Sequence, residues 1–256
     1  MMLKMKNPRL FFILCATMLA SMAAQADEIK ILTAGAFKPV VTALAPEFER
    51  RTGHTLRIDN ATAGALVKRI SDGEAFDLVV LPSSGIEQLT KDGKLSASAS
   101  VRLARVAIGI AVKSGAAMPD ISSVAKFKDV LLSARSVAYI DPTAGGSSGI
   151  YLAGLFERMG IAADMKRKAV LVPGGLVAER VVNGEADMAI HQISEIVAVQ
   201  GAVLVGPLPA ELQNYTTYVG GMASKAANAQ AAQAFLSVLS SPAVQALLEA
   251  KGMEKP

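Results

Sequence analysis

Cysteine and histidine are scarce in this sequence of 256 residues, which contains one cysteine and two histidines. Cys15 lies within an apolar run near the N-terminus, and His54 and His191 are far apart in the chain. Disulfide bonds and a thiolate metal site are therefore excluded for the rest of the chain. Two distant histidines also lack the spacing of metal ligands, so we expect neither a metal nor another cofactor.

Aromatic residues and net charge are also low. Phe, Trp and Tyr make up 5% of the residues, and the formal net charge is +4. Three basic residues, Lys4, Lys6 and Arg9, precede the apolar run, so the remaining chain is nearly neutral. A nucleic-acid partner is not expected, because both the basic footprint and the stacking platforms are missing. The sequence also lacks a nucleophile elbow, a phosphate-binding loop with lysine and a dinucleotide fingerprint.

The N-terminal residues have the pattern of a secretory signal peptide. Basic residues precede the run LFFILCATMLASMAA, which ends at Ala24-Gln25-Ala26. The run is too short for a spanning helix, and its A-x-A ending is typical of a cleavage site. We predict a signal peptide over residues 1–26. Because no second long apolar run follows, we expect a periplasmic protein with no membrane insertion after cleavage.

Strand-like and helix-like segments alternate after the signal, which predicts an α/β fold with parallel strands. The first half predicts strands over 29–32, 55–59, 76–81 and 101–112, and helices over 38–53, 63–73 and 86–95. The second half predicts strands over 136–141, 169–172, 187–192 and 202–209, and helices over 120–134, 150–161 and 176–186. The segment 216–224 reads as a strand that returns to the first half, and closing helices follow over 231–252. We therefore predict two lobes, with lobe one over 27–107 plus 219–256 and lobe two over 108–218.

Four junctions between a strand and the next helix share small residues and hydroxyls. They are TAGAFK (33–38), NATAGA (60–65), DPTAGGSSG (141–149) and VPGGL (172–176). In open α/β sheets, ligands bind beyond the carboxyl ends of the strands. Helix N-termini there present unpaired N–H groups that suit an anion. One such loop is ordinary turn and cap chemistry, but four equivalent loops favour an anion-binding cleft.

The order of several segments resembles that of the molybdate-binding proteins. The resemblance covers essentially the whole chain after the signal. In chain order, the matching segments are TAGAF, LAPEFERRTGH, DLVVLPSS, DP, SGIY, FERMGI, NGEADMAI and GPLPAEL. The resemblance implies the two-lobed fold of the type 2 periplasmic binding proteins, with a ligand cleft between the lobes.

This chain departs from that family where the family holds its oxyanion. Ala36 stands at the position of a binding serine, Thr62-Ala63-Gly64 replaces a run of serines, and Gln192 stands at a site-closing tyrosine. The family's sites use neutral hydroxyl and N–H donors, whereas this chain loses hydroxyls and has a cation at Lys38. Charge-assisted hydrogen bonds offset the desolvation of a carboxylate, so we expect a small carboxylate rather than molybdate.

The same loops contain the residues that we predict to bind the substrate. Lys38 begins a helix, where a cation opposes the helix dipole, so its side chain is either solvated or compensates an anion. The set comprises Ala36, Lys38, Thr62, Ala63, Ser147, Ser148, Gly175 and Gln192.

His191 and Glu195 are the candidates for acid–base chemistry. His191 ends an apolar strand and can be a proton carrier, a ligand donor or a core histidine, and its pKa range suits proton transfer. Glu195 can cap or tether the chain, or serve as a base. Neighbours on a regular strand face opposite sides, so one of His191 and Gln192 is expected to line the cleft.

The chain also resembles the bacterial aconitate isomerases, which are similar to the molybdate binders. This resemblance implies a cofactor-independent isomerase that interconverts trans- and cis-aconitate by an allylic proton shift. For that chemistry, our first candidate for the base is His191 and the second is Glu195. The alternative is a non-catalytic solute-binding protein of an ABC importer, which would need a permease partner. Its ligand would be a small carboxylate or a molybdate-like oxyanion. The sequence alone leaves both open.

Overall fold

The computed structural model of the protein describes residues 26–256. The predicted signal peptide lies outside the described residues, apart from Ala26. The described chain alternates strands and helices and builds a mixed, nine-stranded sheet covered by helices. The α/β fold class predicted from the alternation is confirmed.

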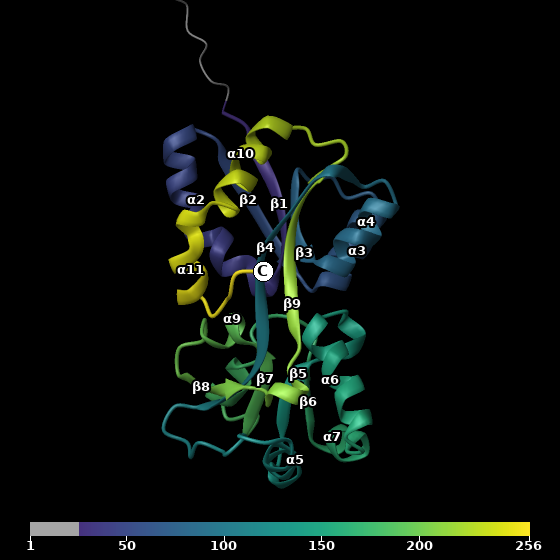
Figure 1. Cartoon of the computed structure of the whole chain (residues 1–256), viewed down its shortest axis with the longest axis vertical. Helices are drawn as coiled ribbons and strands as arrows, with labels where there is room; N and C mark the ends of the chain where they lie inside the picture. The colour runs from purple at the N-terminus through teal and green to yellow at the C-terminus, as the bar shows by residue number, and fades with distance from the viewer. Residues whose placement is uncertain (1–25) are drawn as a thin grey trace, which may run out of the picture.

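The first half of the sheet has a parallel edge. Strand β1 (Glu28–Ala34) pairs in parallel with β2 (Thr55–Ala61) and β3 (Leu78–Pro82). The sheet continues antiparallel through β9 (Tyr215–Ala223) and the long β4 (Leu95–Lys113). The helices of this half, which flank the sheet in Figure 1, are α2 (Lys38–Thr52), α3 (Ala63–Ser71), α4 (Ser83–Lys91), α10 (Ala229–Leu239) and α11 (Gln245–Ala250), with short 3₁₀ turns at η1 (Gly35–Phe37) and η4 (Pro242–Val244).

The second half is built on the far end of β4. There β4 pairs antiparallel with β7 (Met188–Gln192) and β8 (Ala202–Pro207), and β5 (Val137–Ile140) lies parallel between β7 and β6 (Ala169–Val172). Its helices are α5 (Val124–Ser133), α6 (Ser147–Arg158), α7 (Ala162–Lys168), α8 (Glu179–Val182) and α9 (Ile193–Ile196), with 3₁₀ turns at η2 (Pro142–Ala144) and η3 (Ala210–Leu212).

Strands β4 and β9 join the two halves, which lie one above the other in Figure 1. Strand β4 changes partners between Ala107, opposite Tyr215 of β9, and Ile108, opposite Gln192 of β7. One apolar core contains buried residues from 29–106 and 218–253, and two further cores contain residues from 108–208. We call these halves lobe one and lobe two, with the boundaries predicted from the sequence. That they move as separate units stays a prediction.

Local sequence explains where the helices next to the sheet begin and end. Helix α2 has Pro39 in its first turn and ends at Gly53, whose φ of 77° is favourable only for glycine. Thr62 caps α3, because its side-chain oxygen accepts a hydrogen bond from the N–H of Ala65. The loops between strands and helices are therefore short, and they bring the helix N-termini to the ends of the strands.

Helices α5 and α8 are clearly shorter than predicted, and two short helices were not predicted. Helix α5 begins at Val124 and not at residue 120, because the Ser123 side chain accepts the capping hydrogen bond from the N–H of Lys126. Helix α8 covers only Glu179–Val182 of the predicted 176–186. Helices α7 and α9 were not predicted, since segments of seven and four residues are too short to show a helical period.

No single helix in residues 26–256 is long and apolar enough to cross a membrane. The pair α10 and α11 passes such a test only when it is joined across a bend of 54°. Both helices contribute side chains to the core of lobe one.

Candidate active site

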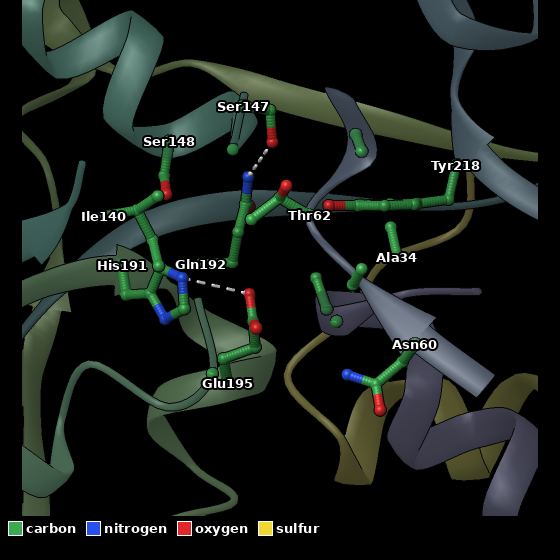
Figure 2. Close-up of a pocket in the computed structure, with 16 residues that line it drawn as sticks. Ala34, Asn60, Thr62, Ile140, Ser147, Ser148, His191, Gln192, Glu195 and Tyr218 are labelled. Atoms are coloured by element: carbon green, nitrogen blue, oxygen red, sulfur yellow. Dashed lines mark hydrogen bonds and ion pairs between the residues drawn. The ribbon is translucent and has the colours of Figure 1, made fainter. Parts of the chain in front are cut away.

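A small pocket lies between the two lobes at the ends of β1, β2, β5 and β7, and Figure 2 shows its lining. It has about 410 Å³ of space free of atoms, a value that includes space open to solvent. The lining residues are Ala34, Gly35, Ala36, Asn60, Ala61, Thr62, Ala63, Ile140, Gly146, Ser147, Ser148, Gly175, His191, Gln192, Glu195 and Tyr218.

The four loops singled out in the sequence all contribute to this lining. Gly35 and Ala36 come from the loop after β1, and Gly175 comes from the loop after β6. The other two loops lead into α3 and α6, each of which begins at the pocket. The first N–H groups of a helix have no partner within the helix, and its positive dipole end favours negative charge. The pocket is therefore suited to an anion.

Nine of the ten residues predicted to bind or act on the substrate line this pocket. The exception is Lys38, whose side chain is exposed at the start of α2 and is not part of the lining. None of the lining residues is a lysine or an arginine. The cationic support that the sequence suggested is therefore not in contact with the pocket in this structure. The positive ends of α3 and α6 are in contact with it.

His191 and Glu195 form a buried pair at one wall of the pocket (Figure 2). His191 is the fourth residue of β7, and Glu195, four positions later, is the third residue of α9. The Nε2 atom of His191 lies 3.2 Å from Oε2 of Glu195, and the two residues are 2% and 7% exposed. His191 Nδ1 is buried without a hydrogen-bond partner among the described residues. The pair can therefore share one proton across this contact.

Burial shifts the two pKa values in opposite directions. It lowers the pKa of His191 from 6.5 to about 3 and raises the pKa of Glu195 from 4.5 to about 8. In each case the charged form loses its hydration. Near pH 7 the pair is therefore uncharged, and the Glu195 carboxyl can donate its proton to Nε2 of the neutral imidazole.

Gln192 lines the pocket beside this pair. Its Nε2 atom lies 3.2 Å from the Ser147 hydroxyl and 2.9 Å from the Thr216 hydroxyl, while its Oε1 atom is buried without a partner. Both His191 and Gln192 therefore contribute to the lining, although neighbours on a regular strand face opposite sides. The reason is that β7 ends at Gln192 and the pocket wraps around the end of the strand.

Tyr218 and Asn60 line the pocket but were not among the predicted site residues. In Figure 2 the Tyr218 hydroxyl points toward the centre of the pocket. Burial and the nearby Glu195 raise the pKa of Tyr218, while the Ser147 side chain works in the opposite direction. Asn60 opens a loop that the sequence did single out, and Tyr218 lies on the strand that returns between the lobes. Local pattern did not distinguish either residue from a packing residue.

The two lobes touch directly at one side of the pocket. The Thr62 hydroxyl donates to the carbonyl of Ala144 at 2.5 Å, and the N–H of Gly64 donates to the carbonyl of Gly145 at 2.9 Å. A Cβ added at Gly64 would lie 2.9 Å from Cα of Gly145, closer than real Cβ contacts come. The main chains of α3 and of the loop before α6 are therefore in contact, and the cleft is closed here.

Within residues 26–256, no group of three or more His, Cys, Asp or Glu residues has the arrangement of a metal site. The chemistry available in the pocket is that of the buried imidazole–carboxyl pair, the hydroxyls, the amides and the helix N-termini.

Fold and pocket together define a two-lobed solute-binding protein with a pocket between the lobes. Residues 29–254 match the profile of the bacterial extracellular solute-binding proteins, and the chain belongs to that family. It is also 35% identical over 249 residues to an aconitate isomerase from a Pseudomonas species, covering 93% of this chain and 94% of that protein.

Solved structures with the same fold are more distant in sequence. The periplasmic molybdate-binding protein of Azotobacter vinelandii superposes with a TM-score of 0.76 at 19% identity, covering 89% of this chain and 99% of that chain. The sulfate-binding protein SubI of Mycobacterium tuberculosis superposes with a TM-score of 0.71 at 18% identity, covering 90% and 87%. These likenesses confirm the two-lobed type 2 fold.

Burial of the pair predicts a change of stability with pH. Between pH 6.5 and 8 the folded chain keeps the Glu195 proton that the unfolded chain has released, so the free energy of unfolding should fall by roughly 1 kcal/mol per pH unit. Between pH 4.5 and 6.5 the depressed pKa of His191 acts in the opposite direction and cancels this slope. Urea unfolding followed by circular dichroism measures the effect. The Glu195→Gln variant should lose the slope above pH 6.5, and equal slopes in both proteins would contradict this assignment.

Proposed function

We propose that this protein is a periplasmic aconitate isomerase that interconverts trans- and cis-aconitate without a cofactor. The observation that carries the proposal is a buried imidazole–carboxyl pair at a small anion pocket, in a chain 35% identical to an aconitate isomerase over nearly its full length. The predicted signal peptide and the extracellular solute-binding family support a periplasmic location.

The reaction needs one proton to leave and one to return. A base removes a proton from the methylene group of trans-aconitate, and the electron pair of that C–H bond spreads over the three-carbon unit and its carboxylates. A proton then adds to the former vinyl carbon, which moves the double bond and yields cis-aconitate. No atom is gained or lost, so a single acid–base group that holds its proton between the two steps is sufficient.

The pair of His191 and Glu195 supplies this group. His191 is the first candidate on the basis of the sequence, but its depressed pKa makes the imidazole a weak base. Glu195 has a pKa of about 8, close to the working pH, which favours it as the residue that changes its proton. We assign proton transfer to Glu195, which acts as the base in its carboxylate form, with the neutral imidazole of His191 as the partner that holds this carboxylate in place through Nε2.

The remaining lining residues hold the carboxylates. The positive dipole ends of α3 and α6 lie at the pocket, and Ser147, Ser148 and Tyr218 add hydroxyls. The Gln192 amide contacts two hydroxyls, and a hydroxyl can either donate or accept a hydrogen bond. The amide can therefore rotate by half a turn, so that its oxygen accepts from these hydroxyls and its NH₂ group faces a carboxylate. These donors stabilise the negative charge that develops when the methylene proton is removed. The substrate-binding role predicted for Lys38 stays a prediction.

The second candidate function is a non-catalytic binding protein of an ABC importer. The specific observation in its favour is the fold, which this chain shares with molybdate- and sulfate-binding proteins. Such a protein needs a closing cleft and a permease partner, but it does not need a proton carrier. Its ligand would be a small carboxylate or an oxyanion.

Conversion of trans-aconitate by the purified protein in a buffer with chelator decides between these functions. We expect equilibration with cis-aconitate, followed by ultraviolet absorbance, and deuterium incorporation in D₂O, followed by NMR. We also expect aconitate to stabilise the fold against heat, by roughly 3 kcal/mol at a concentration 100 times the Kd. Tight aconitate binding without conversion would leave the transport function, and stabilisation by molybdate alone would contradict a carboxylate ligand.

A further inference from the structure

Helix α9, which carries Glu195, is seated between two glycines. A Cβ at Gly109 of β4 would lie 2.7 Å from Cγ1 of Ile193, and a Cβ at Gly252 would lie 2.8 Å from Cγ2 of Ile193. Both distances are shorter than real Cβ contacts. The Ile193 side chain therefore fills a notch that exists only because both positions are glycine.

Glu195 is in similarly close contact with lobe one. A Cβ at Gly35 would lie 2.5 Å from Oε1 of Glu195, so this carboxyl oxygen rests directly on the main chain of η1. Glu195 belongs to lobe two by its place in the chain, whereas Gly35 and Gly252 belong to lobe one. The position of the carboxyl therefore depends on contacts with both lobes.

The segment that contains Gly252 is itself fixed to the strands that join the lobes. We call residues 252–254 the tail. Met253 is 2% exposed and belongs to the core of lobe one. Glu254 and Arg105 of β4 exchange two main-chain hydrogen bonds of 2.9 Å, and the Arg105 Nε donates to the Glu254 carboxylate at 2.8 Å. The Arg105 guanidinium also lies 4.5 Å from the centre of the Tyr215 ring on β9. Figure 1 shows the C-terminus at the middle of the molecule, between the two halves.

We propose that Gly35 and Gly252 are positioning residues that fix α9 and thereby place the Glu195 carboxyl against His191 and the substrate. Gly252 is held in place by the other two residues of the tail, Met253 and Glu254. The inference rests on the proposed role of Glu195 as proton carrier. A helix of four residues has little stability of its own, so its position is set by its neighbours. A displacement of about 1 Å at a catalytic group can lower turnover by about 100-fold.

The sharpest test compares Gly252→Ala with Gly160→Ala. The two glycines have φ of 69° and 68°, so both variants carry the same backbone strain, but nothing lies within 4 Å of a Cβ at Gly160. Gly252→Ala should lower kcat by about 10- to 100-fold with a small change in KM, because the loops at α3 and α6 keep their geometry. Gly160→Ala should keep the wild-type kcat, although both variants lose similar thermal stability. Equal kcat values for the two variants would overturn the proposal.

The pH profile provides a readout that a merely structural effect would not change. Among the described residues, the titratable side chains facing Glu195 are His191 from β7 and Tyr218 from β9, while η1 contributes Gly, Ala and Phe. A shift of α9 admits water to Glu195, so the ionisation that controls kcat should move to lower pH in Gly252→Ala. In the double variant Gly252→Ala/Ile193→Ala the new methyl group has room. The reduction in its kcat should therefore be smaller than the product of the reductions in the two single variants. An unchanged profile, or losses that multiply, would count against the positioning role.

A measurement without substrate separates this inference from the proposed function. The chain has two histidines, so ¹⁵N-histidine NMR reports on His191 directly once a His54→Gln variant has assigned the signals. The imidazole signals of His191 should shift in Gly252→Ala and match the wild type in Gly160→Ala. If the wild type does not convert aconitate but this shift occurs, the proposed function fails and the positioning of the pair stands. Unshifted signals in Gly252→Ala would overturn the positioning.

Discussion

Glu195→Gln should lower the turnover of trans-aconitate by about 10²- to 10⁴-fold, the range that a positioned acid–base group contributes. Gln has nearly the same shape as Glu, so the buried contact with His191 Nε2 at 3.2 Å can persist as an amide hydrogen bond. The variant can no longer take up and return a proton. Substrate binding should survive, because the helix N-termini and the hydroxyls that hold the carboxylates are unchanged.

A comparison of Glu195→Gln with His191→Ala separates the roles of the two residues. Steady-state kinetics and calorimetric titration with aconitate should show a loss in kcat and a similar Kd for Glu195→Gln. Glu87→Gln, at an exposed position on α4, controls for the loss of a carboxyl elsewhere. His191→Ala should also lower kcat into the same range, since Glu195 loses the partner that holds its carboxyl group in place. Full activity in Glu195→Gln with a loss in His191→Ala would return the role of proton carrier to His191.

Gly64→Ala should weaken ligand binding even though it favours the helix that it belongs to. Ala has a better helix propensity than Gly by up to about 1 kcal/mol, so lobe one should not lose stability. The added Cβ would lie 2.9 Å from Cα of Gly145 in the opposite lobe, which is main chain and cannot turn aside. Overpacking of about 1–3 kcal/mol in the closed state corresponds to a rise in Kd of about 5- to 150-fold.

Gly154→Ala provides the control for this effect. Gly154 is also a helix residue, and a Cβ there meets only the end of the flexible Arg158 side chain at 3.3 Å. Calorimetric titration with aconitate should therefore give the wild-type Kd for Gly154→Ala and a raised Kd for Gly64→Ala. A wild-type Kd in Gly64→Ala would show that the contact between Gly64 and Gly145 is not needed in the bound state.

The alternation of short periodic segments was sufficient to predict the α/β class. Each signal depends on near neighbours in the chain, such as Pro39 and Gly53 at the two ends of α2 or the Thr62 cap of α3. The four strand-to-helix loops could be recognised for the same reason, and all four reach one pocket. The sequence did not predict the short elements correctly, because α8 and α9 have four residues each and show no helical period.

The chemistry of the pocket depends on contacts that no local pattern contains. The one-turn helix α9 places Glu195 next to His191, and the contact of this carboxyl with Gly35 joins residues 160 positions apart. Burial between two lobes, and not sequence spacing, sets the opposite pKa shifts of the pair. Tyr218 reaches the pocket because β9 crosses between the lobes. Lys38, the first residue of α2, is exposed and does not line the pocket. Near-neighbour preferences thus set the elements and their order, whereas desolvation and the meeting of distant segments in the closed fold set the acid–base site.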